Sequence, residues 1–282
     1  MGQLKLDTFP PKPSRGYVGH VTYQSPQKPH NPVDPEITQI HALSFGQAAD
    51  LYNAARPTYP DEALRWAFGD TPKDLVDVGA GTGLLSRGLI TAGHRVTAVE
   101  PDRLMLNKLI AVTDGLAGHR HGGAEDLPLP DASADAVTAG QAYHWFDPSL
   151  ALPQIRRVLR PGGHFVPIWN VRDESVDWVK QLSDIVGSSA AELAAGLAGR
   201  PGYFEPFFGT PELKLFPHEK PLSPEGLIRL VQSRSYYFTA DEDRRHRIME
   251  GVTELLNEHP LLAGRQRFAM PYVTHVYRLI AD

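Results

Sequence analysis

The feature that most constrains this chain is a glycine-rich turn between an apolar stretch and a helical pattern. Residues 75–89 read LVDVGAGTGLLSRGL, with Gly79, Gly81 and Gly83 at alternate positions. Glycines at such a corner allow backbone conformations that a Cβ would forbid, and they let a ligand approach the peptide planes. The first N–H groups of the following helix have no partner within the helix, so they face that ligand. The stretch therefore predicts a strand, a ligand-binding turn and a helix in succession.

Strands and helices alternate around this turn. Apolar stretches predict strands at 74–78, 95–100, 118–122, 135–140 and 164–169, and periodic patterns predict helices at 83–92, 101–112 and 148–160. Such alternation is typical of a parallel sheet that is covered by helices on both faces. The crossovers between its strands are expected to be right-handed.

The alternation stops after Asn170. The remaining sequence predicts helices at 174–199, 223–232 and 240–258, an aromatic loop at 202–209, and strands at 212–220 and 267–280. Thr239 and Glu242 have the spacing of a capping box at the start of the helix 240–258. Pro271 cannot donate to a central ladder, so the terminal strand is expected at a sheet edge or bent.

The first forty residues contain many prolines and lack apolar periodicity. These prolines are Pro10, Pro11, Pro13, Pro26, Pro29, Pro32 and Pro35. The segment is therefore predicted to be an extended tail. A helix is expected to begin after Ser44 and to end before Arg56-Pro57, because the residue before a proline disfavours the helical region. A second helix is expected at 61–68.

Composition excludes several classes of function. The 282 residues carry a formal net charge of -5 and include no cysteine. Disulfides and a cysteine nucleophile are therefore excluded, and the charge argues against nucleic acid as the main partner. No apolar stretch reaches the ~20 residues that a membrane helix needs. We expect a cytoplasmic protein without a membrane partner, either a monomer or a homodimer.

An acidic residue accompanies the glycine turn. Glu100 ends the next predicted strand, about twenty positions downstream, where an acid commonly binds ribose hydroxyls. The dinucleotide pattern G-x-G-x-x-G would require a glycine where Leu84 stands, so the spacing favours a nucleoside ligand without pyrophosphate. A nicotinamide-dependent oxidoreductase is thereby disfavoured. A non-catalytic cofactor-binding or regulatory protein on the same scaffold stays open.

Four segments resemble the class I S-adenosylmethionine-dependent methyltransferases. The segments are VDVGAGTG, AVEPDRLML, GGAEDLPLPDASADAV and VLRPGGHF, in the order that the family shows, and the likeness spans about residues 45–170. FGQAADLYNAARPTYP and QAYHWFD further resemble small-molecule enzymes similar to trans-aconitate methyltransferase. The resemblance implies a Rossmann-like, doubly wound α/β fold. Its seven-stranded sheet would be mostly parallel with an antiparallel last strand, and a small helical cap would be added.

The resemblance also divides the chain. It implies an S-adenosylmethionine-binding core at 41–170 after the extension at 1–40, a helical and aromatic cap at 171–210, and a C-terminal completion of the sheet at 211–282. The residues expected to bind the cofactor are Tyr52, Arg56, Asp77, Gly79, Ala80, Gly81, Gly83, Glu100, Pro101, Asp102, Ala124, Glu125 and Gln141.

The implied roles follow the parts of the cofactor. Asp77 would hold the amino group, Glu100 both ribose hydroxyls, and Pro101 and Asp102 would flank the adenine. Ala124 and Glu125 would contact the edge of the adenine, and Gln141 would lie beneath the sulfonium. Tyr52 and Arg56 would close over the methionine carboxylate, a suitable partner for a guanidinium.

The methyl acceptor is expected to be a small molecule, bound by residues outside the glycine turn. The candidates are Tyr143, His144, Trp145, Trp169, Arg234 and Tyr236. His144 titrates near neutral pH and is either a base or a positioning residue. If the acceptor is a carboxylate, no base is needed. The aromatic loop 202–209 and the run SRSYYF at 233–238 are candidate lids, and no cluster shows the spacing of metal ligands.

Overall fold

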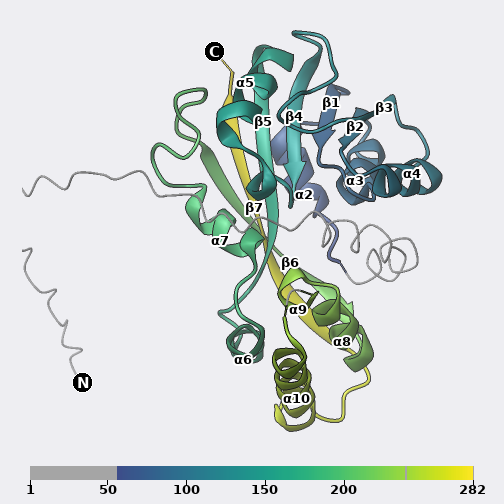
Figure 1. Cartoon of the computed structure of the whole chain (residues 1–282), viewed down its shortest axis with the longest axis vertical. Helices are drawn as coiled ribbons and strands as arrows, with labels where there is room; N and C mark the ends of the chain where they lie inside the picture. The colour runs from purple at the N-terminus through teal and green to yellow at the C-terminus, as the bar shows by residue number, and fades with distance from the viewer. Residues whose placement is uncertain (1–55, 239, 282) are drawn as a thin grey trace, which may run out of the picture.

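The computed structural model describes residues 56–238 and 240–281. The expected tail at 1–40, the helix expected after Ser44 and the cofactor residue Tyr52 lie outside this range. The described chain forms one seven-stranded sheet in the order β3-β2-β1-β4-β5-β7-β6 (Figure 1).

Most of the sheet is parallel. The parallel strands are β1 (Asp74–Val78), β2 (Arg95–Glu100), β3 (Gly118–His121), β4 (Ala134–Gly140) and β5 (Leu159–Arg172). The last strand, β7 (Phe268–Ile280), is antiparallel to both of its neighbours, β5 and β6 (Glu212–Leu222). The predicted Rossmann-like fold with an antiparallel last strand is confirmed. Its strand order reverses between β1 and β4, and ligands of such sheets bind at the carboxyl ends of the strands beside that point.

Helices cover both faces because strand residues alternate between them. Leu75 of β1 packs with α2 (Asp61–Phe68) and α3 (Leu84–Thr91), whereas its neighbour Val76 packs on the opposite face. That opposite face is covered by α5 (Pro148–Val158) and α7 (Ala190–Leu197). A further helix, α4 (Arg103–Val112), contacts β2 and β3.

A second apolar core lies beyond the parallel part of the sheet. It is built from α6 (Asp177–Val186), α8 (Pro224–Gln232) and α10 (Glu242–Glu258), packed on the ends of β6 and β7. In Figure 1 these helices gather at the lower end of the molecule, with the short α9 (Ser235–Phe238) beside α8. The boundaries of the cap and of the other segments stay predictions.

Three details differ from the sequence predictions. The stretch 174–199 forms two helices, because Gly187 ends α6 with a φ of 85° and Ser189 starts α7 through a capping box. The last long helix begins at Glu242, capped by Asp241. The predicted cap, Thr239, lies outside the described residues.

The third difference concerns Pro271, because β7 is interior and not at a sheet edge. β5 pairs with β7 as far as Arg172 opposite Tyr272, and the N–H of Asp173 then donates to the carbonyl of Pro271. In an antiparallel strand the N–H and C=O of one residue point to the same neighbour. The missing N–H of Pro271 therefore faces Asp173, one residue beyond the end of β5, so only the last bond of this pairing is missing.

Candidate functional site

The glycine turn adopts the conformation that the sequence predicts. Gly79 and Gly81 have φ values of 67° and 57°, which side chains rarely tolerate. A Cβ at Gly79 would come within 2.7 Å of the Cβ of Ala142, whereas a Cβ at Gly81 would meet nothing within 4 Å. Gly79 thus lets β1 and the segment after β4 approach each other, and Gly81 faces open space.

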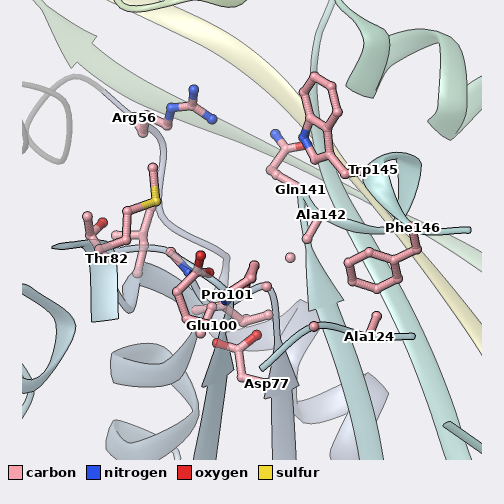
Figure 2. Close-up of a pocket in the computed structure, with 18 of the residues that line it drawn as sticks. Arg56, Asp77, Thr82, Glu100, Pro101, Ala124, Gln141, Ala142, Trp145 and Phe146 are labelled. Carbon is pink, nitrogen blue, oxygen red and sulfur yellow. The ribbon is translucent and has the colours of Figure 1, made fainter. Parts of the chain in front are cut away.

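That open space is a cavity of about 380 Å³ at the carboxyl ends of β1, β2 and β4. Its volume lies in the usual range for small-molecule sites. The predicted residues that line it are Arg56, Asp77, Gly79, Ala80, Gly81, Glu100, Pro101, Ala124, Glu125, Gln141 and Trp145. In the view of Figure 2, Asp77 and Glu100 lie at the floor, with Arg56, Gln141 and Trp145 across from them.

Glu100 is fixed by two backbone hydrogen bonds. Its Oε2 accepts from the N–H of Gly81 at 2.7 Å and its Oε1 from the N–H of Asp102 at 2.9 Å. Burial raises the pKa of Glu100, which these backbone bonds oppose. Each carboxylate oxygen has a second lone pair, so Glu100 can accept from two further donors, such as a pair of vicinal hydroxyls.

Asp77 presents one oxygen to the cavity. Its Oδ2 accepts from the hydroxyl of Ser86 at 2.6 Å, whereas its Oδ1 is buried and has no hydrogen-bond partner. Burial, with a smaller contribution from the charge of Glu100, raises the pKa of Asp77 to about 7. A buried carboxylate oxygen without a partner is a site for a hydrogen-bond donor, best a cation.

Gln141 lies directly after β4 with a φ of 55°, unusual for a residue other than glycine. Its Nε2 donates to the main-chain carbonyl of Asn170 at 3.0 Å, and its Oε1 is buried without a partner. Backbone conformations of this kind cluster at functional sites. The amide therefore offers a fixed hydrogen-bond acceptor to the cavity.

Comparisons with known proteins identify the relatives of this chain. Residues 76–166 match the family model described as a methyltransferase domain. An uncharacterized methyltransferase of Mycobacterium tuberculosis is 40% identical over 233 residues, which cover 83% of this chain and 93% of the relative. This chain belongs to the class I S-adenosylmethionine-dependent methyltransferases.

Other relatives support the assignment. An uncharacterized methyltransferase of Schizosaccharomyces pombe is 33% identical over 239 residues, 80% of this chain and 92% of the relative. A solved structure from Anaeromyxobacter dehalogenans, provisionally named a type II methyltransferase, aligns with a TM-score of 0.59 at 22% identity and covers 80% of this chain and 97% of that chain. The structural likeness shows that the two proteins share a fold.

Two predicted cofactor residues do not line the cavity of this methyltransferase. Gly83 is the N-cap of α3 with a φ of 81°, and a Cβ there would lie 2.9 Å from Leu109. Asp102 caps α4 by accepting from the N–H of Leu104 at 2.7 Å. Both residues shape the elements around the cavity.

Several lining residues were not predicted. They are Pro57, Tyr59, Thr82, Leu84, Leu85, Met105, Gly123, Gly140, Ala142, Phe146 and Asn170. Most of them lie next to a predicted residue in the sequence, and this closeness in sequence is the signal that could have found them. Met105, on α4, and Asn170, within β5, reach the cavity through tertiary packing.

The candidate acceptor-binding residues Tyr143, Trp145 and Trp169 differ in whether they reach the cavity. Tyr143 is 2% exposed and packs against Phe165 and Phe204, and burial raises the pKa of its hydroxyl. Trp169 is also fully buried, so neither side chain lines the cavity. Trp145 lines the cavity and is 59% exposed, which places it at the mouth.

His144 lies behind the cavity wall and does not line it. Its Nδ1 is 3.4 Å from the indole Nε1 of Trp169. Burial, together with the positive charge of Arg56, lowers the pKa of His144 to about 4. The imidazole is therefore neutral at pH 7, with Nδ1 as an acceptor.

The aromatic loop at 202–209 is part of the core. Phe204 and Phe208 are 1% and 3% exposed and pack in the cluster beneath α5 and α7. The prediction that this loop is a lid is therefore wrong for these side chains. The apolar side chains of this loop indicate that they are buried, but the sequence does not indicate which part of the protein they pack against.

Arg234 and Tyr236 line a second, smaller cavity together with Arg172 and Glu192. Its volume of about 10 Å³ is close to the space that one water needs. The charge of Arg56 favours ionisation of the Tyr236 phenol, although burial raises its pKa overall. Arg56, in the wall of the first cavity, therefore acts electrostatically on a residue of the second.

The described residues contain neither a metal site nor a helix that could span a membrane. No group of three or more histidine and acidic side chains there has the arrangement of a metal site. Within the same part of the chain, the helices are too short or too polar to span a bilayer.

Proposed function

We propose that this methyltransferase takes the methyl group from S-adenosylmethionine and transfers it to a small-molecule acceptor at the cavity beside β1, β2 and β4. The observation that carries the proposal is the joint placement of the glycine turn and Glu100, whose carboxylate accepts from Gly81 while it faces the cavity. In a strand–helix turn that bound no ligand, neither the glycines nor the acid would need the other.

The donor set fits each part of this cofactor. The unpartnered oxygen of Asp77 suits the ammonium, the carboxylate of Glu100 suits the ribose hydroxyls, and the guanidinium of Arg56 suits the methionine carboxylate. Ala124 and Glu125 line the end of the cavity after β3, where the adenine would lie. Gly81 supplies the open space that a side chain would fill.

Bound S-adenosylmethionine supplies a methyl group that is activated by the positive charge on its sulfur. The protein mainly has to align the acceptor with that methyl group and exclude water, because the displacement is in line. Trp145 and Phe146 line the cavity, and aromatic faces are favourable neighbours of a cation.

We favour a carboxylate over a hydroxyl as the acceptor group. A carboxylate is ionised at pH 7, so it has no proton to remove. Its oxygen would form a bond to the methyl carbon while the carbon–sulfur bond breaks, and the electron pair of the broken bond would stay on the sulfur. Burial lowers the pKa of His144 to about 4, which makes it a weak base, and its side chain does not line the cavity; both observations disfavour it as the base. Arg234 and Tyr236 stay proposed acceptor residues, and the three guanidiniums of Arg56, Arg172 and Arg234 all act on the Tyr236 phenol.

The names of other relatives do not decide the acceptor atom. A malonyl-[acyl-carrier protein] O-methyltransferase of Serratia marcescens is 36% identical over 131 residues, 44% of this chain. A ubiquinone/menaquinone biosynthesis C-methyltransferase of Rubrivivax gelatinosus is 34% identical over 121 residues, 39% of this chain. No finding supports the nicotinamide-dependent oxidoreductase, and it is not proposed.

Calorimetric titration of the full chain with S-adenosylhomocysteine and with NADH tests the cofactor. We expect binding of the first and no response to the second, and the reverse result would refute the proposal. A screen of small acids, phenols and amines with S-adenosylmethionine, followed through formation of S-adenosylhomocysteine, then tests the acceptor. Turnover of phenols or amines with no turnover of any acid would refute the carboxylate.

A further inference from the structure

Asn170, within β5, has every hydrogen-bonding position of its side chain occupied. Its Nδ2 donates to the carbonyls of Pro57 and Thr58, both at 3.2 Å. Its Oδ1 accepts from the hydroxyl of Thr274 at 2.6 Å and lies 3.2 Å from Nε2 of His218. A primary amide offers two donors and two acceptor positions, so this side chain is saturated. It is 4% exposed and lies in the cavity wall.

The partners fix the orientation of this amide. Two carbonyls can only accept, so the NH2 group of Asn170 must face Pro57 and Thr58. Its oxygen then faces His218, whose Nε2 has to carry the proton. Burial lowers the pKa of His218, which keeps the ring neutral at pH 7 with that nitrogen protonated.

The residues held by Asn170 form the entry segment 56–59, which we call the strap. Arg56, Pro57 and Tyr59 all line the cavity. Lys220, on β6, supplies a second tether by donating from Nζ to the carbonyl of Arg56 at 2.7 Å. The strap is therefore held to the sheet by hydrogen bonds from β5 and from β6, and Arg56 is part of this tethered segment.

Asn170 also holds the opposite wall. Its main-chain carbonyl accepts from Nε2 of Gln141, which leaves the unpartnered Oε1 of Gln141 in the cavity wall. The φ of 55° at Gln141 is costly, so its position depends on such bonds. One residue thus connects the strap to the amide of Gln141.

We propose that Asn170 is a positioning residue for methyl transfer, which holds the strap and the amide of Gln141 in a single arrangement around the cofactor. The proposal goes beyond the cofactor contacts assigned above and rests on the proposed function. The side chain of Asn170 acts through the strap and Arg56, whereas its main-chain carbonyl holds Gln141. Loosening the side chain should free the strap and weaken cofactor binding together.

The first test needs no ligand. In the full chain, Asn170→Ala removes both bonds to the strap, whereas Thr138→Val is a matched control. Thr138 makes a similarly buried bond between β4 and β5, to the carbonyl of Val166 at 2.7 Å, and does not line the cavity. We expect hydrogen exchange at the amides of Ala63 and Leu64, which donate to the carbonyl of Pro60 directly after the strap, to be about tenfold faster in Asn170→Ala and unchanged in the control. Equal exchange in the two variants would overturn the proposal.

A milder variant covers the case in which Asn170→Ala does not fold. Thr274→Val keeps the shape of the side chain and removes one donor to Asn170 Oδ1. Thr274→Val should speed hydrogen exchange at the same amides as Asn170→Ala, by a smaller factor. Circular dichroism measures unfolding of the whole chain separately. Exchange equal to that of the wild type in Thr274→Val would then count against the proposal.

The second test uses S-adenosylhomocysteine. Asn170→Ala should weaken its binding about tenfold to thirtyfold, from two lost hydrogen bonds. Asn170→Asp adds a pH signature that a purely structural role would not give. Its carboxylate repels the strap carbonyls at pH 8, whereas burial favours the protonated carboxyl, which can donate to one of them, as the pH falls. Its affinity relative to wild type should therefore be higher at pH 5 than at pH 8.

The outcomes separate the two proposals. If the wild-type protein does not bind S-adenosylhomocysteine, the proposed function fails, and the exchange comparison still decides the role of Asn170. If the wild type binds and both Asn170 variants bind as tightly as the wild type at pH 5 and at pH 8, the positioning role is refuted.

Discussion

The carboxylate of Glu100 accepts a hydrogen bond from the N–H of Gly81 across 2.7 Å, so the acid that ends β2 and the turn that follows β1 form one unit. The parallel pairing of β1 with β2 brings the two strand ends together. A ligand that binds the acid must therefore lie against the turn.

Gly81→Arg should abolish binding of S-adenosylhomocysteine. A side chain at Gly81 would enter the cavity, and its φ of 57° adds backbone strain. Calorimetric titration measures the loss. Gly196→Arg is the control, because Gly196 is exposed on α7 and a Cβ there meets nothing within 4 Å. Binding by Gly81→Arg with the wild-type affinity would show that the cavity is not the cofactor site.

Glu100→Gln should weaken the same binding by about 2 kcal/mol, near thirtyfold, because hydrogen bonds to a charged group are lost. An amide nitrogen would also face the N–H of Gly81 or of Asp102, where an oxygen now accepts. Glu219→Gln, on the exposed part of β6, provides a control with the same change of charge. The affinity of Glu219→Gln should match the wild type; equal affinities for all three proteins would contradict the role of Glu100.

The sequence predicted the parts of the site that depend on local patterns. The turn, its strand and Glu100 lie within segments whose apolar period and glycine spacing specify the structure. Leu84 starts α3, as expected if no third glycine is needed there. These features are set by residues close in sequence, so one chain was enough to find them.

The sequence could not predict the features that depend on distant segments. Asn170 contacts the strap more than one hundred positions earlier, and Thr274 as far beyond it. The burial of Trp169 and Tyr143 results from the packing of α7 and the aromatic loop on β5, which periodicity does not reveal. The division of 174–199 had a local signal, Gly187, but an isolated glycine does not always end a helix.

Cofactor binding should depend on pH through Asp77. Burial raises the pKa of Asp77 to about 7, so protonated and ionised forms coexist in the unliganded protein near neutral pH. An ammonium favours the ionised form, so binding should release protons near pH 7 and strengthen from pH 6 to pH 8. Titration in two buffers with different ionisation enthalpies measures the proton count. Asp77→Asn should bind more weakly and lose this contribution; the same proton count in the variant would exclude Asp77 as its source.

The buried ion pair between Arg172 and Glu192 should contribute strongly to stability. Arg172 donates to both carboxylate oxygens, at 2.7 and 2.9 Å, and joins β5 to α7, with side chains 6% and 14% exposed. Glu192→Gln leaves the guanidinium without its charge partner and should lower the free energy of unfolding by about 3 kcal/mol. Asp184→Asn breaks the exposed pair with Lys180 and should cost less than about 0.5 kcal/mol. Urea unfolding of the three proteins at pH 7 measures both changes.

The same pair predicts how stability varies with acidity. Burial alone would raise the pKa of Glu192, but the charge of Arg172 and the hydrogen bond from Ser189 outweigh it, so the pKa is lowered. A carboxyl with a lowered pKa in the folded state stabilises the fold above its unfolded pKa, and this contribution is lost as the pH falls through the folded value. The stability difference between wild type and Glu192→Gln should therefore be constant near pH 7 and shrink below about pH 4. A difference that stays the same down to pH 3 would show that the effect of the substitution comes from packing and not from the charge.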